Sequence, residues 1–316
     1  MAWELRVHNS DEINRYISME NMQPQTTNNQ LPVFWSDDYV MASGVETRTK
    51  SGPLAKILKN CEVPGVEIMS PAPATREELL TIHEPQYVDQ LINGDEELAR
   101  SILASTGGVR DALDAMLKFG KAGSLSSGLH HAKPNKDFGL CYINGLALAA
   151  LRAINHHGIK KVGVYDLDAH CGGGTFTMLG DNPNVILADV SCNTFDSWQP
   201  KSDRHFLKIV NSSSEYLEAV RVGLAHLTGV DALIYNAGMD PFEDDRMGGL
   251  SGITREVLAE RERMVAQWCE DTNTPAMFVL AGGYCNSKSD LNRLVRLHLI
   301  TVKEFARINT RNFNKD

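Results

Sequence analysis

The chain has 316 residues, of which 42% are hydrophobic and 22% are charged, so it can bury a large core as one α/β domain or two smaller ones. Its net charge of -9 argues against direct binding to nucleic acid or to an anionic membrane, whereas a neutral or cationic substrate is compatible with it. The six cysteines form no C-x-x-C pair, the start lacks a signal-peptide pattern and no apolar run reaches the ~18 residues of a membrane span, so we expect a cytoplasmic protein with reduced thiols.

The order of apolar and polar segments predicts a parallel sheet. Residues 1–30 are mixed and polar, and we expect an N-terminal arm or loop region there, followed by one domain over residues 31–316. Strands are predicted at residues 31–35, 162–167, 185–190, 231–238 and 276–283. Helices are predicted from Pro53, after a capping box at Thr75, and over residues 85–92, 109–120, 143–157, 215–227, 254–270 and 290–307. Strands that alternate with such helices predict right-handed crossovers and helices on both faces of the sheet.

Three polar residues follow the predicted strand at residues 162–167. Asp166, Asp168 and His170 are spaced two apart, so an extended backbone aims their side chains the same way. Carboxylates that converge with an imidazole are costly to bury without a cation, and this ligand set suits a divalent ion such as zinc. Taken alone, the three residues are equally compatible with a strand-end turn and a solvated histidine.

Polar residues at other strand ends strengthen the case for a site. Asp240 and Tyr284 each follow a predicted strand, and His130 and His131 share a loop that leads to a predicted helix. Functional residues of a parallel sheet collect at the carboxyl ends of its strands. Each of these residues has a structural alternative, namely a turn, a loop aromatic or a structural histidine pair. Their occurrence together favours a common site.

These residue types are sufficient for metal-assisted hydrolysis of an amide. Asp168, His170 and Asp240 would supply three ligands and leave an open position, as in a catalytic zinc site. The ion would lower the pKa of a water molecule and polarise a carbonyl group. A neutral histidine can move the proton of that water, and a tyrosine hydroxyl can stabilise the oxyanion.

At this point the chain resembles the histone deacetylase family of zinc-dependent deacetylases, which includes acetylpolyamine amidohydrolases, and it is most similar to a divergent bacterial-type member. The likeness runs from residue 31 to the last predicted helix. It is carried by ordered motifs: SGLHHA (127–132), DFGLCYINGLALAA (137–150), VYDLDAH (164–170), NAGMD (236–240) with the later Asp245 and GGL (248–250), and LAGGY (280–284).

The resemblance implies an α/β, arginase/deacetylase-like three-layer fold with a central, mostly parallel β-sheet. It implies one Zn²⁺ on Asp168, His170 and Asp240, and catalytic roles for His130, His131, Tyr284 and for Asp166, which would orient His130. It also implies a substrate channel at Gly139, Leu140 and Gly282, and a structural K⁺ or Na⁺ held by Asp166, Asp168, His170, Ser191 and Cys192. The substrate would be an acylated amine, either a small molecule such as an acylpolyamine or a peptide with acyl-lysine. Homo-oligomerisation stays open.

The sequence departs from the family pattern after His170. Relatives continue with a second histidine, a glycine and then Asp or Asn, where this chain has Cys171, Gly172 and Gly173. The side chain that would support His131 is therefore expected to be absent unless another residue replaces it, and His131 is expected to titrate lower than in relatives.

The predicted channel departs from the pattern as well. Leu140 stands where relatives have an aromatic residue, so one aromatic wall is expected to be lost, with Phe195 or Trp198 as candidates for the other. The link between the helices at 85–92 and 109–120 is shorter than relatives often have, which predicts a more open entrance.

Two rival functions remain. A dimanganese ureohydrolase of the arginase type would need a further aspartate two residues beyond His170, where the chain has Gly172. A zinc-binding pseudoenzyme or binding protein is suggested by Gly173 and the altered channel. Because all the expected ligands, both histidines and Tyr284 are present, the sequence favours an enzyme.

Overall fold

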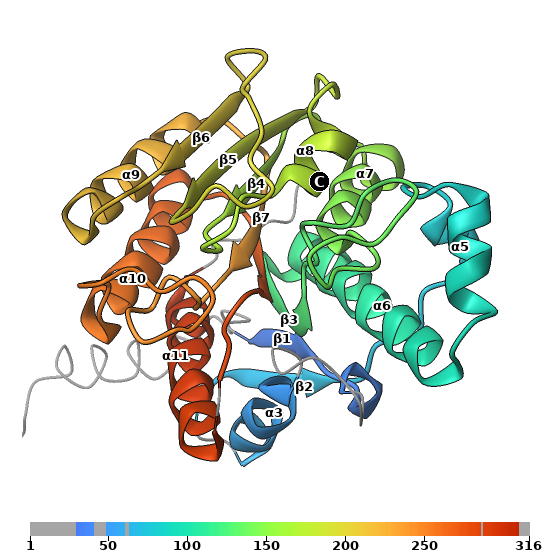
Figure 1. The fold of residues 1–316 in the computed structure, drawn as a ribbon, viewed down its shortest axis with the longest axis horizontal. Helices are drawn as coiled ribbons and strands as arrows, with labels where there is room; N and C mark the ends of the chain where they lie inside the picture. The colour runs from blue at the N-terminus through green and yellow to red at the C-terminus, as the bar shows by residue number, and fades with distance from the viewer. Residues whose placement is uncertain (1–29, 41–48, 61–62, 286, 310–316) are drawn as a thin grey trace, which may run out of the picture.

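The central element of the fold is a sheet of parallel strands (Figure 1). The computed structural model describes residues 30–40, 49–60, 63–285 and 287–309, so the predicted arm at residues 1–30 lies outside the described part apart from its last residue. Neighbouring strands pair in parallel in the order β2-β1-β3-β8-β7-β4-β5-β6. The strands are β1 (Leu31–Phe34), β2 (Val66–Met69), β3 (Lys121–Ser127), β4 (Val162–Asp166), β5 (Val185–Ser191), β6 (His205–Ile209), β7 (Ala232–Ala237) and β8 (Ala276–Leu280).

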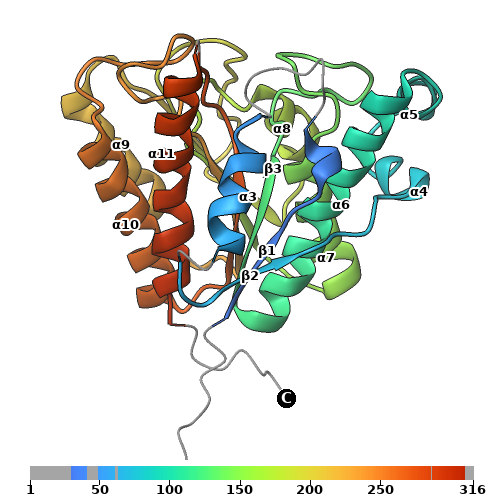
Figure 2. The same ribbon diagram turned by 90° about the horizontal axis from the view of Figure 1, so that it is seen from below.

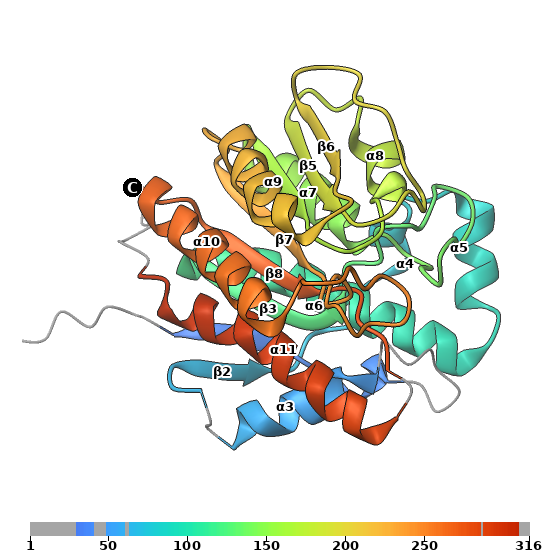
Figure 3. The same cartoon turned by 60° about the vertical axis from the view of Figure 1, so that its left-hand side comes forward.

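Helices cover both faces of the sheet, so the described part of the chain forms three layers (Figure 2). One face carries α3 (Ser51–Lys59), α9 (Ser213–His226), α10 (Arg255–Thr272) and α11 (Lys288–Arg307), and Figure 3 shows the last three side by side. The other face carries α6 (Glu96–Phe119), α7 (Gly145–His157) and α8 (Gly173–Leu179), with α4 (Arg76–Leu79), α5 (Pro85–Ile92) and the 3-10 helix η1 (Asp37–Tyr39) nearby. A buried hydrophobic cluster lies between the sheet and each helix layer. The predicted parallel sheet flanked by helices is confirmed.

All five predicted strands are present, as β1, β4, β5, β7 and β8, but β2, β3 and β6 were not predicted. Strand β3 has the sequence KAGSLSS, in which Leu125 is the one bulky apolar residue. Its small side chains are required by packing, because a Cβ atom at Gly123 would overlap the ring of Phe278 in the neighbouring β8. A buried strand therefore has the composition of a loop.

Helix α6 begins earlier than predicted, so the link between it and α5 is shorter than the sequence indicated. It begins at Glu96, where the Asp95 carboxylate accepts a hydrogen bond from the Leu98 N–H at 2.8 Å, and it runs through Gly107 and Gly108. A Cβ atom at Gly107 would overlap the Ala72 carbonyl oxygen, and one at Gly108 would overlap the Tyr39 hydroxyl. The two glycines allow close packing rather than ending a helix, and the link to α5 shortens to residues 93–95.

The sheet brings the predicted polar residues to one edge. The loops that follow β3, β8, β7, β4 and β5 leave from neighbouring positions, because these five strands are adjacent in the sheet. The register places Asp166 beside Asn236 on one side and beside Asp189 on the other. None of the described helices is both long and apolar enough to cross a membrane.

Candidate active site

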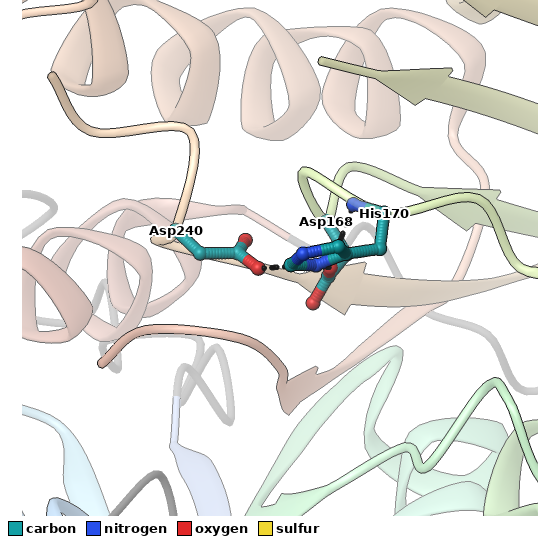
Figure 4. A group of neighbouring side chains, drawn as sticks. All are labelled: Asp168, His170 and Asp240. Carbon is teal, nitrogen blue, oxygen red and sulfur yellow. Dashed lines mark hydrogen bonds and ion pairs between the residues drawn. The ribbon is translucent and has the colours of Figure 1, made fainter. Parts of the chain in front are cut away.

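Asp168, His170 and Asp240 converge at the centre of this edge (Figure 4). The His170 Nδ1 atom lies 3.0 Å from Asp168 Oδ1 and 3.0 Å from Asp240 Oδ2. One ligand atom from each residue lies within 4.8 Å of the other two, and all three residues are buried. The structure thus brings together two loops that are separated by 70 residues in the chain.

Backbone amides hold the two carboxylates in place. The N–H of Ala169 donates to Asp240 Oδ1 at 2.9 Å, and the N–H of Gly282 donates to Asp168 Oδ2 at 2.6 Å. A Cβ atom on Gly282 would overlap the Asp240 carboxylate and would lie 2.6 Å from Asp168 Oδ2. Gly282, predicted as a channel residue, therefore lies directly against the two carboxylates.

The donor set fits a divalent cation. Burial and the neighbouring Asp168 raise the pKa of Asp240 to about 7. Burial lowers the pKa of His170, but the hydrogen bonds with Asp168 and Asp240 outweigh this and raise it to about 11. Two buried carboxylates are costly unless a positive charge lies between them. Two oxygen ligands and one nitrogen ligand match the three protein ligands of a catalytic zinc site.

His130 and His131 lie beside this group in the loop after β3, with ring centroids 3.9 Å apart. The Nδ1 atom of His130 donates to Asp166 Oδ2 at 2.7 Å, and Asp166 Oδ1 also accepts a hydrogen bond from the Asn236 amide. Burial lowers the pKa of His130, but the charges of Asp166 and Asp168 raise it to about 10. His130 is therefore protonated near neutral pH.

His131 has a carboxylate partner after all. Its Nδ1 atom lies 3.0 Å from Oδ2 of Asp196, in the loop after β5. Gly173 supplies no side chain to His131, and Asp196 is the residue that replaces the missing partner. Burial and the charge on His130 lower the pKa of His131 to about 4, so this ring is neutral near pH 7.

Tyr284 follows β8 and faces the metal-binding group. Its ring lies 6.4 Å from the His170 ring, at an interplanar angle of 89°. Its backbone N–H donates to Asp245 Oδ2 at 2.7 Å, which fixes the start of the loop. Burial raises the pKa of Tyr284 well above its usual range, so the hydroxyl keeps its proton.

Of the two predicted aromatic candidates, Phe195 lies beside His131 and Trp198 does not. The rings of Phe138 and Phe195 stack at 5.2 Å, and Phe195 also contacts His131 edge to face at 5.0 Å. Trp198 instead stacks on Phe176, away from His131. Leu140 is 49% exposed, whereas Gly139 lies so close to His131 that a Cβ atom there would overlap the imidazole.

The residues proposed for a monovalent ion lie at the ends of β4 and β5. The hydroxyl of Ser191 donates to Asp189 Oδ1 at 2.5 Å, and the N–H of Cys192 donates to the Ala169 carbonyl at 2.8 Å. Burial and the nearby Asp166 raise the pKa of Asp189 to about 7. Asp189 was not predicted as a site residue, although its position at the end of a predicted strand is the same signal that marked Asp166.

Four further residues were missed: Phe138, Asn236, Lys133 and Asp196. Phe138 lies in DFGLCYINGLALAA and Asn236 lies in NAGMD, two of the motifs that carried the resemblance. The sequence therefore offered a signal for both residues. Lys133 and Asp196 meet only in space, where Lys133 Nζ donates to Asp196 Oδ1 at 2.6 Å. No spacing in the sequence marks that pair.

Comparisons with known proteins agree with this geometry. The sequence model of the histone deacetylase domain matches residues 44–301. An uncharacterized protein of Picosynechococcus sp. is 29% identical over 288 residues, which cover 83% of this chain and 94% of that protein. Histone deacetylase 2 of Arabidopsis thaliana is 24% identical over 251 residues, which cover 70% of this chain and 64% of the relative.

A solved structure extends the likeness to the fold. The crystal structure of acetylpolyamine aminohydrolase from Burkholderia pseudomallei matches with a TM-score of 0.72 and 16% identity, covering 88% of this chain and 99% of that one. This confirms the predicted arginase/deacetylase-like three-layer α/β fold. Because the domain model spans well over half of the sequence, the chain belongs to the histone deacetylase family.

Proposed function

We propose that this protein is a zinc-dependent amide hydrolase that removes an acetyl or other acyl group from an amine. The observation that carries the proposal is the buried group of Asp168, His170 and Asp240, surrounded by His130, His131 and Tyr284. The substrate class is an acyl-lysine, an acylpolyamine or a related small amine. Family membership and the likeness to an acetylpolyamine aminohydrolase support this class.

Asp168, His170 and Asp240 would hold the zinc ion. When bound there, zinc would lower the pKa of a water molecule and polarise the carbonyl group of the amide. The backbone amides of Ala169 and Gly282 keep the two carboxylates pointing to one place before the ion arrives. Such partners of metal ligands are known to tune metal affinity.

His131 is suited to act as the general base. It is neutral near pH 7, and its Nδ1–H donates to Asp196, which leaves the Nε2 lone pair free to accept a proton from water. The same imidazole can then give that proton to the leaving amine. Proton transfer of this kind contributes roughly 10²- to 10⁴-fold to a rate.

His130 and Tyr284 are suited to stabilise negative charge. The charges of Asp166 and Asp168 raise the pKa of His130, which favours the protonated ring, and His130 lies beside the group that would bind the amide. The Tyr284 hydroxyl keeps its proton and can donate a hydrogen bond to the oxyanion that forms from the carbonyl.

The rival functions are less well supported. A second metal would need a carboxylate at position 172, but a Cβ atom on Gly172 would lie 2.6 Å from Asp166 Oδ2. The pseudoenzyme hypothesis rested on Gly173 and on the altered channel. Asp196 supplies His131 with the partner that Gly173 cannot provide, so only the altered channel still favours that hypothesis. On the resemblance alone, we include in the proposal a K⁺ or Na⁺ near Asp166 and Ser191.

Metal analysis and turnover together test the proposal. Purified protein is loaded with zinc, its metal content is measured, and hydrolysis of fluorogenic acetyl-lysine, acylated peptides and acetylated polyamines is assayed. We expect one zinc ion per chain and hydrolysis of at least one substrate class. Zinc-loaded protein that hydrolyses none of them would refute the proposed function, and two manganese ions per chain would favour a ureohydrolase.

A further inference from the structure

The partner of His131 comes from a loop rather than from the end of β4. Asp196 Oδ2 lies 3.0 Å from His131 Nδ1, although the two residues are 65 positions apart in the chain. The Asp196 side chain is only 8% exposed. The contact is therefore a buried, charge-assisted hydrogen bond, which is stronger than a neutral one.

Two further contacts hold the Asp196 carboxylate, and a third holds its loop. Lys133 Nζ donates to Oδ1 at 2.6 Å, and the N–H of Gly174, at the start of α8, donates to Oδ2 at 3.1 Å. The loop itself is tied to Cys171, whose N–H donates to the Phe195 carbonyl at 3.0 Å. A buried carboxylate with this number of donors has a fixed orientation and can fix the ring that it contacts.

Gly173 makes room for this arrangement. A Cβ atom there would lie 2.5 Å from Asp196 Oδ1 and would overlap the Asp196 carbonyl oxygen. Asp196 itself has a φ of 54°, a left-handed conformation that aspartate adopts more readily than most residues. A side chain at position 173 would occupy the space that the Asp196 carboxylate fills. Glycine at position 173 and aspartate at position 196 therefore depend on each other.

We propose that Asp196 is the positioning residue of His131, and that Gly173 is required to admit it. This inference rests on the proposed function, in which His131 is the base. Asp196 accepts a hydrogen bond from Nδ1–H, which selects the tautomer with a free Nε2 atom and fixes the plane of the ring. Lys133 balances the charge of Asp196.

Two substitutions disturb this contact from opposite sides. Asp196→Ala removes the acceptor, and Gly173→Ala displaces it. We expect both variants to lower kcat by about 100-fold, which is the effect of losing a general base, with little change in KM. Zinc content should stay the same, since neither residue contacts Asp168, His170 or Asp240. The matched controls are Asp203→Ala, at an exposed aspartate, and Gly52→Ala, where the nearest atom to the new Cβ is 3.7 Å away.

A measurement without turnover separates this inference from the proposed function. In ¹⁵N-histidine NMR spectra of the zinc-loaded protein, assigned with His131→Gln, the His131 signals should show one tautomer protonated at Nδ1. Asp196→Ala should give mixed tautomers. If the wild type hydrolyses nothing but the tautomer responds in this way, the proposed function fails and the positioning role stands.

Other outcomes overturn the inference. A wild-type kcat in Asp196→Ala, or an unchanged His131 tautomer, would show that Asp196 does not position the ring. Loss of zinc, or an equal rise in KM for both variants, would show that the contact only supports the structure of the loop.

Discussion

A single methyl group at Gly282 tests the metal site most directly. The Cβ atom of Gly282→Ala would lie 2.6 Å from Asp168 Oδ2 and would overlap the Asp240 carboxylate, whereas real Cβ contacts stay beyond 3.0 Å. Both carboxylates would have to move by roughly 0.4 Å or more. Metal–ligand distances tolerate only about 0.2 Å, so the ligand set would be distorted.

The expected result is a zinc affinity that is about 10- to 100-fold weaker, the usual effect of disturbing the groups around metal ligands. This corresponds to about 1.4 to 3 kcal/mol of binding free energy. The assay is competition for zinc against a chromophoric chelator of known affinity at fixed pH, because zinc binding depends on pH.

Gly52→Ala serves as the control, since its new Cβ atom meets only ordinary contacts. It should leave the zinc affinity unchanged. Unfolding curves of both variants show whether the fold is retained. A folded Gly282→Ala protein with wild-type zinc affinity would refute the assignment of Asp168 and Asp240 as ligands.

The remaining predictions concern catalysis and stability. Tyr284→Phe should keep zinc and lower kcat by about 100-fold, the cost of one oxyanion donor; an unchanged kcat would remove the tyrosine from the mechanism. Burial lowers the pKa of His83 to about 4. As the pH falls below 6.5, the unfolded chain therefore gains a proton at His83 before the folded chain does. The free energy of unfolding should decrease as the pH is lowered. Urea unfolding of the wild type should show a loss of about 2 kcal/mol from about pH 7.5 to about pH 5, and this loss should be absent in His83→Gln. An equal loss in both proteins would contradict the lowered pKa of His83. Gly108→Ala should lower the free energy of unfolding by about 1–3 kcal/mol, because its Cβ would overlap the Tyr39 hydroxyl, and a thermal midpoint at or above that of the wild type would contradict this.

The candidate site was predictable where it depends on strand geometry. Asp168 and His170 are spaced two apart, and Asp240 and Tyr284 follow apolar strands, so the edge of a parallel sheet brings them together. The layers of the fold were predictable for the same reason, because apolar strands alternate with amphipathic helices.

Features that depend on close packing were not predictable. Gly107 and Gly108 are typical of a helix end, yet they lie within α6 because the Ala72 backbone and Tyr39 leave no room for side chains. The sequence of β3 is typical of a loop because Phe278 fills the space beside Gly123. Asp196 reaches His131 through a loop conformation that no local pattern encodes.

The stacked pair of Phe138 and Phe195 has a mechanical consequence. Parallel rings at 5.2 Å are in contact and leave no slot for a methylene chain between them. A substrate that passes between them must separate the rings, at a cost of about 0.5–1.5 kcal/mol for the lost stacking. Because Asp196 is the next residue after Phe195, the ring stack and the carboxylate that contacts His131 are carried by adjacent residues of one loop.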